Sequence, residues 1–127
     1  YETEGGGLDF AWSAFRQDVN LSNTLDNTRR TDPLSVPQNF SVMAHILVAM
    51  NDGTAFVAFV GCPDVPDVAA AFGTTANFEM TNTTNGNTDD IRVRTSAAGL
   101  LAARASIAGP IDTYAVATQG FRWARRN

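Results

Sequence analysis

The sequence contains no lysine, one cysteine and one histidine in 127 residues, and each scarcity excludes a class of site. The single cysteine, Cys62, cannot form a disulfide within the chain and is expected to be a small buried hydrophobic residue. Zinc sites need several histidine or cysteine ligands, so His45 and Cys62 are too few, and we expect no metal and no other cofactor. His45 lies in an apolar stretch, which is more typical of a core or interface position than of a catalytic base.

Charged residues are also scarce, at 17% of the chain, and the two signs are separated along it. Residues 1–90 hold twelve of the thirteen acidic side chains, whereas residues 91–127 hold six of the nine arginines. Because the net charge is −4, a nucleic acid would have to bind against the field of the whole protein, and we expect no such partner. The separation favours acidic loops of one copy meeting basic strand faces of another.

The chain lacks the motifs of membrane proteins and of enzymes. No apolar run approaches the roughly 18 residues of a membrane-spanning helix, so no membrane partner is expected. The carboxylate pairs Asp64 with Asp67 and Asp89 with Asp90 follow no calcium-loop pattern and have no glycosidase context, so we interpret them as solvated turn residues. No nucleophile with a matching base can be identified, and the chain is not expected to be an enzyme.

The length suits one domain. Residues 1–7 contain two glutamates and three consecutive glycines, which is typical of a flexible lead or linker. Residues 8–127 are sufficient for a single domain with a sizeable core. Because residue 1 is tyrosine and not methionine, we also expect further sequence upstream of it.

What the chain has in abundance is the two-residue alternation of β-strands. In the run from Phe40 to Met50, one face carries Val42, Ala44, Ile46, Val48 and Met50, and the other carries Met43, His45, Leu47 and Ala49. Both faces are largely apolar, so a second layer of the chain or a neighbouring copy must cover the second face. The sequence Asn51-Asp52-Gly53 and a second apolar run to Gly61 follow, and this pattern predicts a hairpin.

The last third of the chain shows the same alternation. Ile91, Val93 and Thr95 share one face of an expected strand, and Arg92 and Arg94 share the other. The small residues 96–99 predict a turn that pairs residues 101–105 with this strand and brings Arg104 to the two earlier arginines. A final strand is expected over Thr113 to Trp123, with a bulge at Gly120 that redirects Phe121 and Trp123.

Shorter elements complete the prediction. We expect strands at 8–14, 29–31 and 77–81, a helical turn at 68–72 and an exposed polar tip at 82–90. A short helix through Trp12, Phe15 and Val19 is an alternative to the first strand, and a helix over 97–105 is disfavoured by Gly99. Seven to eight short strands with regularly spaced turns predict an all-β protein, an antiparallel β-sandwich resembling a jelly roll.

The order of these C-terminal segments is similar to that of a known family. An Arg-Val-Arg-Thr strand, a small-residue turn ending in glycine, an Ala-Arg-Ala strand and a Tyr-x-Val-x-Thr-x-Gly-aromatic strand precede a terminal Arg-Arg pair. This run, over 90–127, resembles the C-terminal β-sandwich domain of tailed-bacteriophage virion accessory proteins. The resemblance implies a structural protein of the virion, assembled in the host cytoplasm: a capsid decoration (cement) protein or a tail or head fibre domain, usually a homotrimer that contacts other capsid or tail proteins.

Two sets of residues are therefore candidates for function. Residues expected at a subunit interface are Met43, His45, Leu47, Arg92, Arg94 and Arg104. The alternative function is a carbohydrate-binding module that recognises a host receptor, because exposed aromatic rings can stack on sugars. Its candidate surface glycan platform is Tyr114, Phe121 and Trp123.

Overall fold

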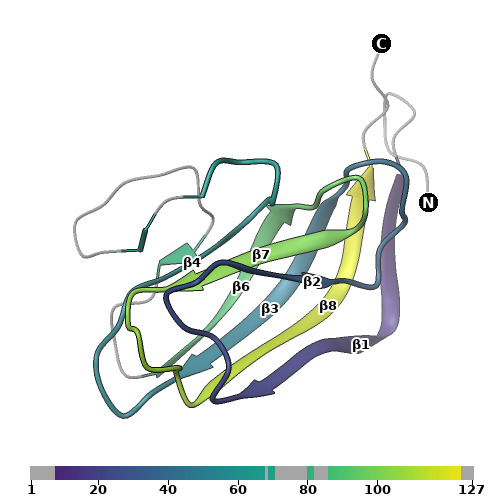
Figure 1. The fold of residues 1–127 in the computed structure, drawn as a ribbon. Coiled ribbons are helices and arrows are strands. Elements are labelled where there is room, and N and C mark those ends of the chain that lie inside the picture. Colours follow the sequence, from purple (N-terminus) through teal and green to yellow (C-terminus); the bar gives the residue numbers. More distant parts are fainter. Residues whose placement is uncertain (1–7, 68, 71–79, 82–85, 124–127) are drawn as a thin grey trace.

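The computed structural model describes residues 8–67, 69–70, 80–81 and 86–123 (Figure 1). These residues form strands and loops, with no helix among them, in two antiparallel sheets packed as a sandwich. The predicted all-β sandwich is confirmed. The strands are β1 (Leu8–Ser22), β2 (Arg30–Pro33), β3 (Met43–Asn51), β4 (Ala58–Gly61), β5 (Met80–Thr81), β6 (Gly86–Arg94), β7 (Leu100–Ala105) and β8 (Thr113–Trp123).

The strand order is that of a jelly roll. One sheet, here called sheet A, has the order β1-β8-β3-β6, and the other, sheet B, has the order β2-β7-β4-β5. The ladders are nested: β1 pairs with β8, β2 with β7, β3 with β6 and β4 with β5. The chain is thus one long antiparallel hairpin that is rolled up. The additional pairs β3–β8 in sheet A and β4–β7 in sheet B connect the strand pairs of each sheet.

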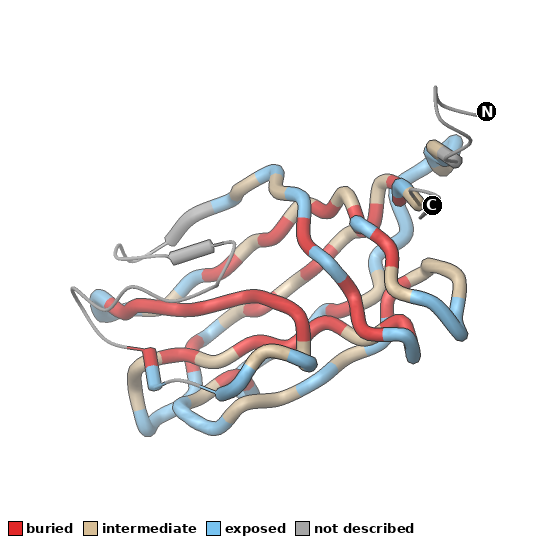
Figure 2. Tube along the Cα trace, turned by 90° about the horizontal axis from the view of Figure 1, so that it is seen from above, coloured by how far each residue is buried: buried red, intermediate tan, exposed pale blue. Residues whose placement is uncertain are grey.

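This topology overturns the hairpin predicted at Asp52 and Gly53. Strand β3 lies in sheet A between β8 and β6, whereas β4 lies in sheet B between β7 and β5, so the two do not pair. Asp52 does form a local turn, in which its carboxylate accepts hydrogen bonds from the amide and hydroxyl of Thr54. Residues 56–60 are buried throughout (Figure 2): residues 56 and 57 end the crossing from sheet A to sheet B, and residues 58–60 belong to β4.

The second predicted hairpin, between residues 90–95 and 101–105, is also wrong. Strand β6 pairs with β3 in sheet A, and β7 pairs with β2 and β4 in sheet B. The expected turn is present, with Gly99 at φ 76° and its amide donating to the carbonyl of Ser96. It folds β7 over the core and not beside β6, so that Val93 and Leu101 both face the interior.

The core lies between the two sheets and confirms the predicted faces. All five side chains of the first predicted face are buried, namely Val42, which directly precedes β3, and Ala44, Ile46, Val48 and Met50 of β3. The same alternation holds along β8, where Tyr114, Val116 and Thr118 are buried. Figure 2 shows this alternation as buried and intermediate segments that take turns along the strands. Sheet B covers only this inner face.

Strand β1 is longer than predicted and is irregular. It runs to Ser22, so the alternative helix through Trp12, Phe15 and Val19 is wrong. Its pairing with β8 shifts register between Ala11 and Arg16, where β1 has extra residues. Gly120 lies against this bulge, and a Cβ there would lie 2.1 Å from the carbonyl oxygen of Phe10, so no side chain fits.

The predicted bulge at Gly120 is confirmed on the β3 side of β8 as well. His45 is opposite Gly120, whereas Ile46 is opposite Thr118, so β8 has one extra residue there. Because of the bulge, the consecutive residues Gly120 and Phe121 are both buried. The side chains of β8 after the bulge therefore face the opposite way from what simple alternation would give.

The remaining predictions have mixed outcomes. The strand expected at 29–31 corresponds to β2, and the final strand at Thr113–Trp123 matches β8. The polar tip expected at 82–90 is wrong from Gly86 onward, because β6 begins there and pairs with β3 along its whole length. The predicted lead at 1–7, most of the helical turn at 68–72 and most of the strand at 77–81 lie outside the described residues.

Candidate functional site

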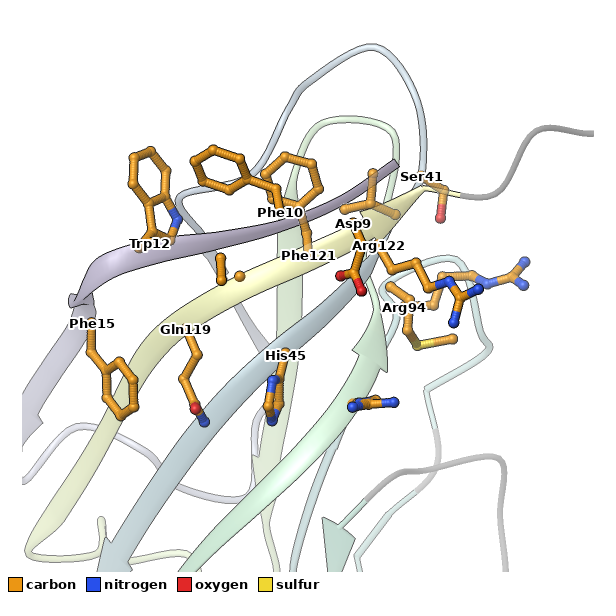
Figure 3. Close-up of a pocket in the computed structure, with 15 residues that line it drawn as sticks. Asp9, Phe10, Trp12, Phe15, Ser41, His45, Arg94, Gln119, Phe121 and Arg122 are labelled. Carbon is orange, nitrogen blue, oxygen red and sulfur yellow. The ribbon is translucent and has the colours of Figure 1, made fainter. Parts of the chain in front are cut away.

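The main candidate site is an open groove at one end of sheet A, with a volume of about 1050 Å³. It lies where β1 and β3 begin and β6 and β8 end. Figure 3 shows Phe15, Gln119 and His45 projecting to one side of the strands, and Trp12, Phe10 and Phe121 to the other. The groove is lined by Asp9, Phe10, Ala11, Trp12, Phe15, Ser41, Val42, Met43, His45, Arg92, Arg94, Gln119, Gly120, Phe121 and Arg122.

Three arginines give the groove its positive charge. Arg94 and Arg122 are both directly opposite Met43 in the ladders, one on each side of it, so their Cα atoms are about 10 Å apart. Arg92 is two residues from Arg94, on the same face of β6, and opposite His45. All three arginines are exposed and contact solvent across the face. The side chain of Met43, which is 37% exposed, lies between them.

Hydrogen bonds link two polar residues of the groove lining, His45 and Gln119, to Asp90 beside the groove. His45 Nε2 and Asp90 Oδ1 are 2.5 Å apart, and the same oxygen accepts a hydrogen bond of 3.2 Å from Nε2 of Gln119. These residues come from three strands, β3, β6 and β8, so the hydrogen bonds tie the outer face of the sheet together. Asp90 and His45 form an ion pair when the imidazole is protonated.

Aromatic residues form the end of the sandwich behind the groove. The Phe10 ring stacks on Phe121 with centroids 5.2 Å apart, and it meets the edge of Trp12 at 4.9 Å. The indole N–H of Trp12 donates to the carbonyl of Ser35, and the Arg16 guanidinium lies 4.3 Å from the centre of its ring. The bulged part of β1 is therefore held by side-chain contacts as well as by its ladder.

Asp18 anchors β1 further along. Its carboxylate accepts hydrogen bonds from the amide of Ser35 at 2.7 Å, from the hydroxyl of Ser35 at 2.6 Å and from the hydroxyl of Thr118 at 2.5 Å. Because charge-assisted hydrogen bonds are stronger than neutral ones, this cluster fixes β1 to β8 and to the loop after β2.

The structure brings together five of the six residues predicted for a subunit interface. Met43, His45, Leu47, Arg92 and Arg94 lie on the outer face of sheet A. Arg104 does not belong to this set, because β7 is in sheet B, where Arg104 forms an ion pair of 2.9 Å with Asp67. The grouping of Arg104 with the other arginines is wrong because it depends on the β6–β7 hairpin.

The predicted glycan platform is not a single exposed surface. Tyr114 is fully buried in the core and Phe121 is 8% exposed, so neither can stack on a sugar in this fold. Burial raises the pKa of the Tyr114 phenol, and the nearby Asp32 carboxylate adds to the effect. Trp123 is half-buried and packs against Phe40 with ring centroids 5.4 Å apart.

The sequence reasoning missed Phe15, which is the most exposed aromatic residue at the groove, at 57%. The odd spacing of Phe15 after Trp12 could have indicated it, because a residue out of phase with a strand often marks a bulge. The same spacing also fits a short helix, and because both interpretations were open, the exposure of the Phe15 ring was not predicted.

Cys62 is buried, as predicted, and burial raises the pKa of its thiol. Among the described residues, no three of His, Cys, Asp and Glu are grouped to hold a metal ion. No helix in the described ranges is long and apolar enough to cross a membrane.

The chain matches no family model, no curated protein and no solved structure.

Proposed function

We propose that this chain is a structural assembly module, of the kind found on tailed-phage virions, that acts as a homotrimer through protein–protein contacts and has no catalytic role. In this proposal it decorates a capsid or forms a fibre domain. The observation that carries the proposal is the outer face of sheet A, an apolar and basic surface that sheet B does not cover.

The composition of this face supports an interface. Leu47 and Ala49 are half-buried, and in the β3–β8 ladder they lie opposite Ala117 and Ala115, so the centre of the face is apolar on the β8 side. On the β6 side, Leu47 is opposite Asp90. Arginines and Met43 flank this centre. Methionine and arginine are enriched at protein interfaces, and an apolar centre with a charged rim is the usual arrangement.

The test is the oligomeric state of the isolated chain. Light scattering at micromolar concentration should give about three times the 13.6 kDa of one copy. Leu47→Arg should abolish assembly but leave the fold intact, because Leu47 is opposite Asp90 in the ladder and the new guanidinium gains a partner. The matched control is Asn27→Arg, in the exposed loop after β1. A monomeric wild-type chain, or an assembled Leu47→Arg variant, would contradict the proposal.

The groove favours a second candidate function, the binding of surface glycans. Its exposed Phe15 ring lies near Gln119 and His45, and sugar sites combine an aromatic face with polar side chains. Jelly rolls occur in viral capsid proteins and in lectins alike, so the fold does not choose between the two functions.

A glycan array separates the two candidates. A cement protein should bind no sugar selectively. A receptor-binding domain should bind a defined set, and Phe15→Ala should weaken that binding about fivefold or more, since stacking on an aromatic ring contributes on the order of 1 kcal/mol or more. Phe40→Ala, which removes an exposed ring outside the groove, is the control.

A further inference from the structure

The two ends of sheet A carry opposite charges. Arg92, Arg94 and Arg122 lie at the groove end. Asp52 directly follows β3 and Asp112 directly precedes β8, so both lie at the other end. β3 spans nine residues between them, which places the two ends about 27 Å apart. We call the second end, formed by Asp52 and Asp112, the acidic end.

The groove arginines have no ion-pair partner within the part of the chain that the structure describes. Arg92 and Arg94 are neighbours on one face of β6, and Arg122 lies on the far side of Met43 from Arg94, so the three like charges repel one another and this repulsion disfavours the isolated chain. A carboxylate placed between them would remove the repulsion and accept charge-assisted hydrogen bonds. Asp9 is directly opposite Arg122 in the β1–β8 ladder, and Asp90 lies beside the groove at His45, so the three arginines exceed these two carboxylates by one charge.

The acidic end has the complementary features. Asp112 is exposed and Asp52 is half-exposed. Hydrogen bonds lower the pKa of the Asp52 carboxyl, chiefly that from the Thr54 hydroxyl, and the backbone of Asp112 is a further contributor. The two acidic residues are therefore neighbours in space. Arg30, on the adjacent sheet, is neutralised by hydrogen bonds of 2.8 and 2.9 Å to Asp32.

We infer that the basic groove of one copy receives the acidic end of the next copy. This inference rests on the proposed function, since it requires that the chain self-assembles. A two-fold contact through the groove would place arginines against arginines and would be repulsive. A contact between two different surfaces is heterologous, and a repeated heterologous contact closes into a ring when its rotation allows, as in a cyclic trimer.

Two variants that remove charge from one end each test the contact. The groove variant is Arg92→Gln with Arg94→Gln. The acidic-end variant is Asp52→Asn with Asp112→Asn, and the amide oxygen introduced at position 52 can still accept the Thr54 hydrogen bonds. Each variant alone should assemble at least tenfold more weakly than the wild type. Mixed in equal amounts, they should form a heterodimer, because one intact groove can then meet one intact acidic end.

Matched controls lie elsewhere on the molecule. Arg104→Gln removes an arginine from sheet B, and Asp64→Asn removes an exposed carboxylate from the loop after β4. Neither should change assembly. Wild-type assembly should also weaken as the salt concentration rises from about 0.05 M to about 0.5 M, because exposed ion pairs are screened. Thermal unfolding and circular dichroism establish that each variant is folded.

The outcomes are distinguishable. A monomeric wild-type chain would remove the proposed function itself. A wild-type oligomer that both variants preserve would overturn only the charge contact. Loss of assembly in the groove variant but not in the acidic-end variant would overturn the inferred occupant, as would an acidic oligosaccharide that binds the wild type and not the groove variant.

Discussion

The two faces of sheet A are built from the same strands but have different environments. On β3, the inner side chains are at most 1% exposed, whereas Met43 on the outer face is 37% exposed. The outer His45, Leu47 and Ala49 are half-buried, and no part of the second sheet lies over them. The described residues therefore cover one apolar face of sheet A and leave the other open to contact.

This difference shows how, in a small β-protein, residues that stabilise the fold can be distinguished from residues that contact another molecule. Burial of the inner face against sheet B drives folding, because removing apolar surface from water is the main favourable contribution. The outer face contributes less to the folded single chain, so its apolar and basic residues are better explained by contact with another molecule. Substitutions on the two faces should consequently have different effects.

The largest expected difference is between two adjacent residues of β3. Ile46→Ala, on the fully buried inner face, should lower the free energy of unfolding by about 3 kcal/mol, from lost burial and a residual cavity. Leu47→Ala, on the outer face, should lower it by about 1 kcal/mol or less. Urea unfolding, measured at a protein concentration too low for assembly, gives the free energy of unfolding of both variants. Equal losses would contradict the distinction between the faces.

The next largest loss of stability is expected at Gly120, in the bulge of β8. Gly120→Ala should lower the free energy of unfolding by about 2 kcal/mol, because the new Cβ would collide with backbone atoms of Phe10 and Ala11. Gly109→Ala is the control, since nothing lies within 4 Å of a Cβ at that position. Thermal unfolding measures both, and an unaffected Gly120→Ala protein would mean that β1 does not approach β8 so closely.

A smaller effect is expected at Tyr114 on the inner face. Its hydroxyl is buried and has no hydrogen-bond partner among the described residues. Tyr114→Phe should therefore raise the free energy of unfolding by about 1 kcal/mol. Thr118→Val is the contrasting control, and it should lower this free energy because its hydroxyl donates to Asp18. Chemical denaturation of the three proteins would test the pair, and a destabilised Tyr114→Phe protein would indicate a hydroxyl partner.

The same residue has a pH signature. Because burial raises the pKa of Tyr114 in the folded chain, the unfolded chain ionises first as the pH rises above about 10. Stability contributed by the neutral phenol is present below that pH and is lost above it. Tyr114→Phe should consequently reduce the alkaline loss of stability, measured as unfolding midpoints between about pH 8 and pH 11.

The smallest effect is on the outer face. Arg94→Gln should raise the stability of the dissociated chain by about 0.3 kcal/mol at low salt, because it relieves repulsion among the groove arginines. The gain should disappear at high salt. Arg104→Gln is the control with the opposite sign, since it breaks an ion pair with Asp67. A loss of stability in Arg94→Gln would show that this arginine has a stabilising partner within the chain.

The local features of this fold could be predicted from sequence to a large extent. The faces of β3, the limits of β8 and the bulge at Gly120 follow from alternation and from the position of one glycine. The pairing of strands could not be predicted in the same way. The Asp52-Gly53 sequence makes a turn, but a turn does not determine whether the next strand lies beside the previous one or above it.

The candidate groove was predictable only in part. Met43, His45, Arg92 and Arg94 were selected because they share strand faces, and β3 and β6 do pair. Their neighbours Arg122 and Gln119 come from β8, which is separated from β3 by more than sixty residues of sequence. Phe15 reaches the groove through a bulge in β1, and its spacing after Trp12 fits either that bulge or a short helix, so the sequence did not decide between them.

By itself, the sequence determined which side chains of each strand face the interior, because alternation along an extended chain is a local property. Only the tertiary structure decided which strands are neighbours. In a jelly roll, strands that follow one another in sequence mostly cross to the opposite sheet, and their ladders form between distant segments such as β1 and β8. Those pairings are decided by how well the two apolar layers enclose one core, which is a property of the whole chain.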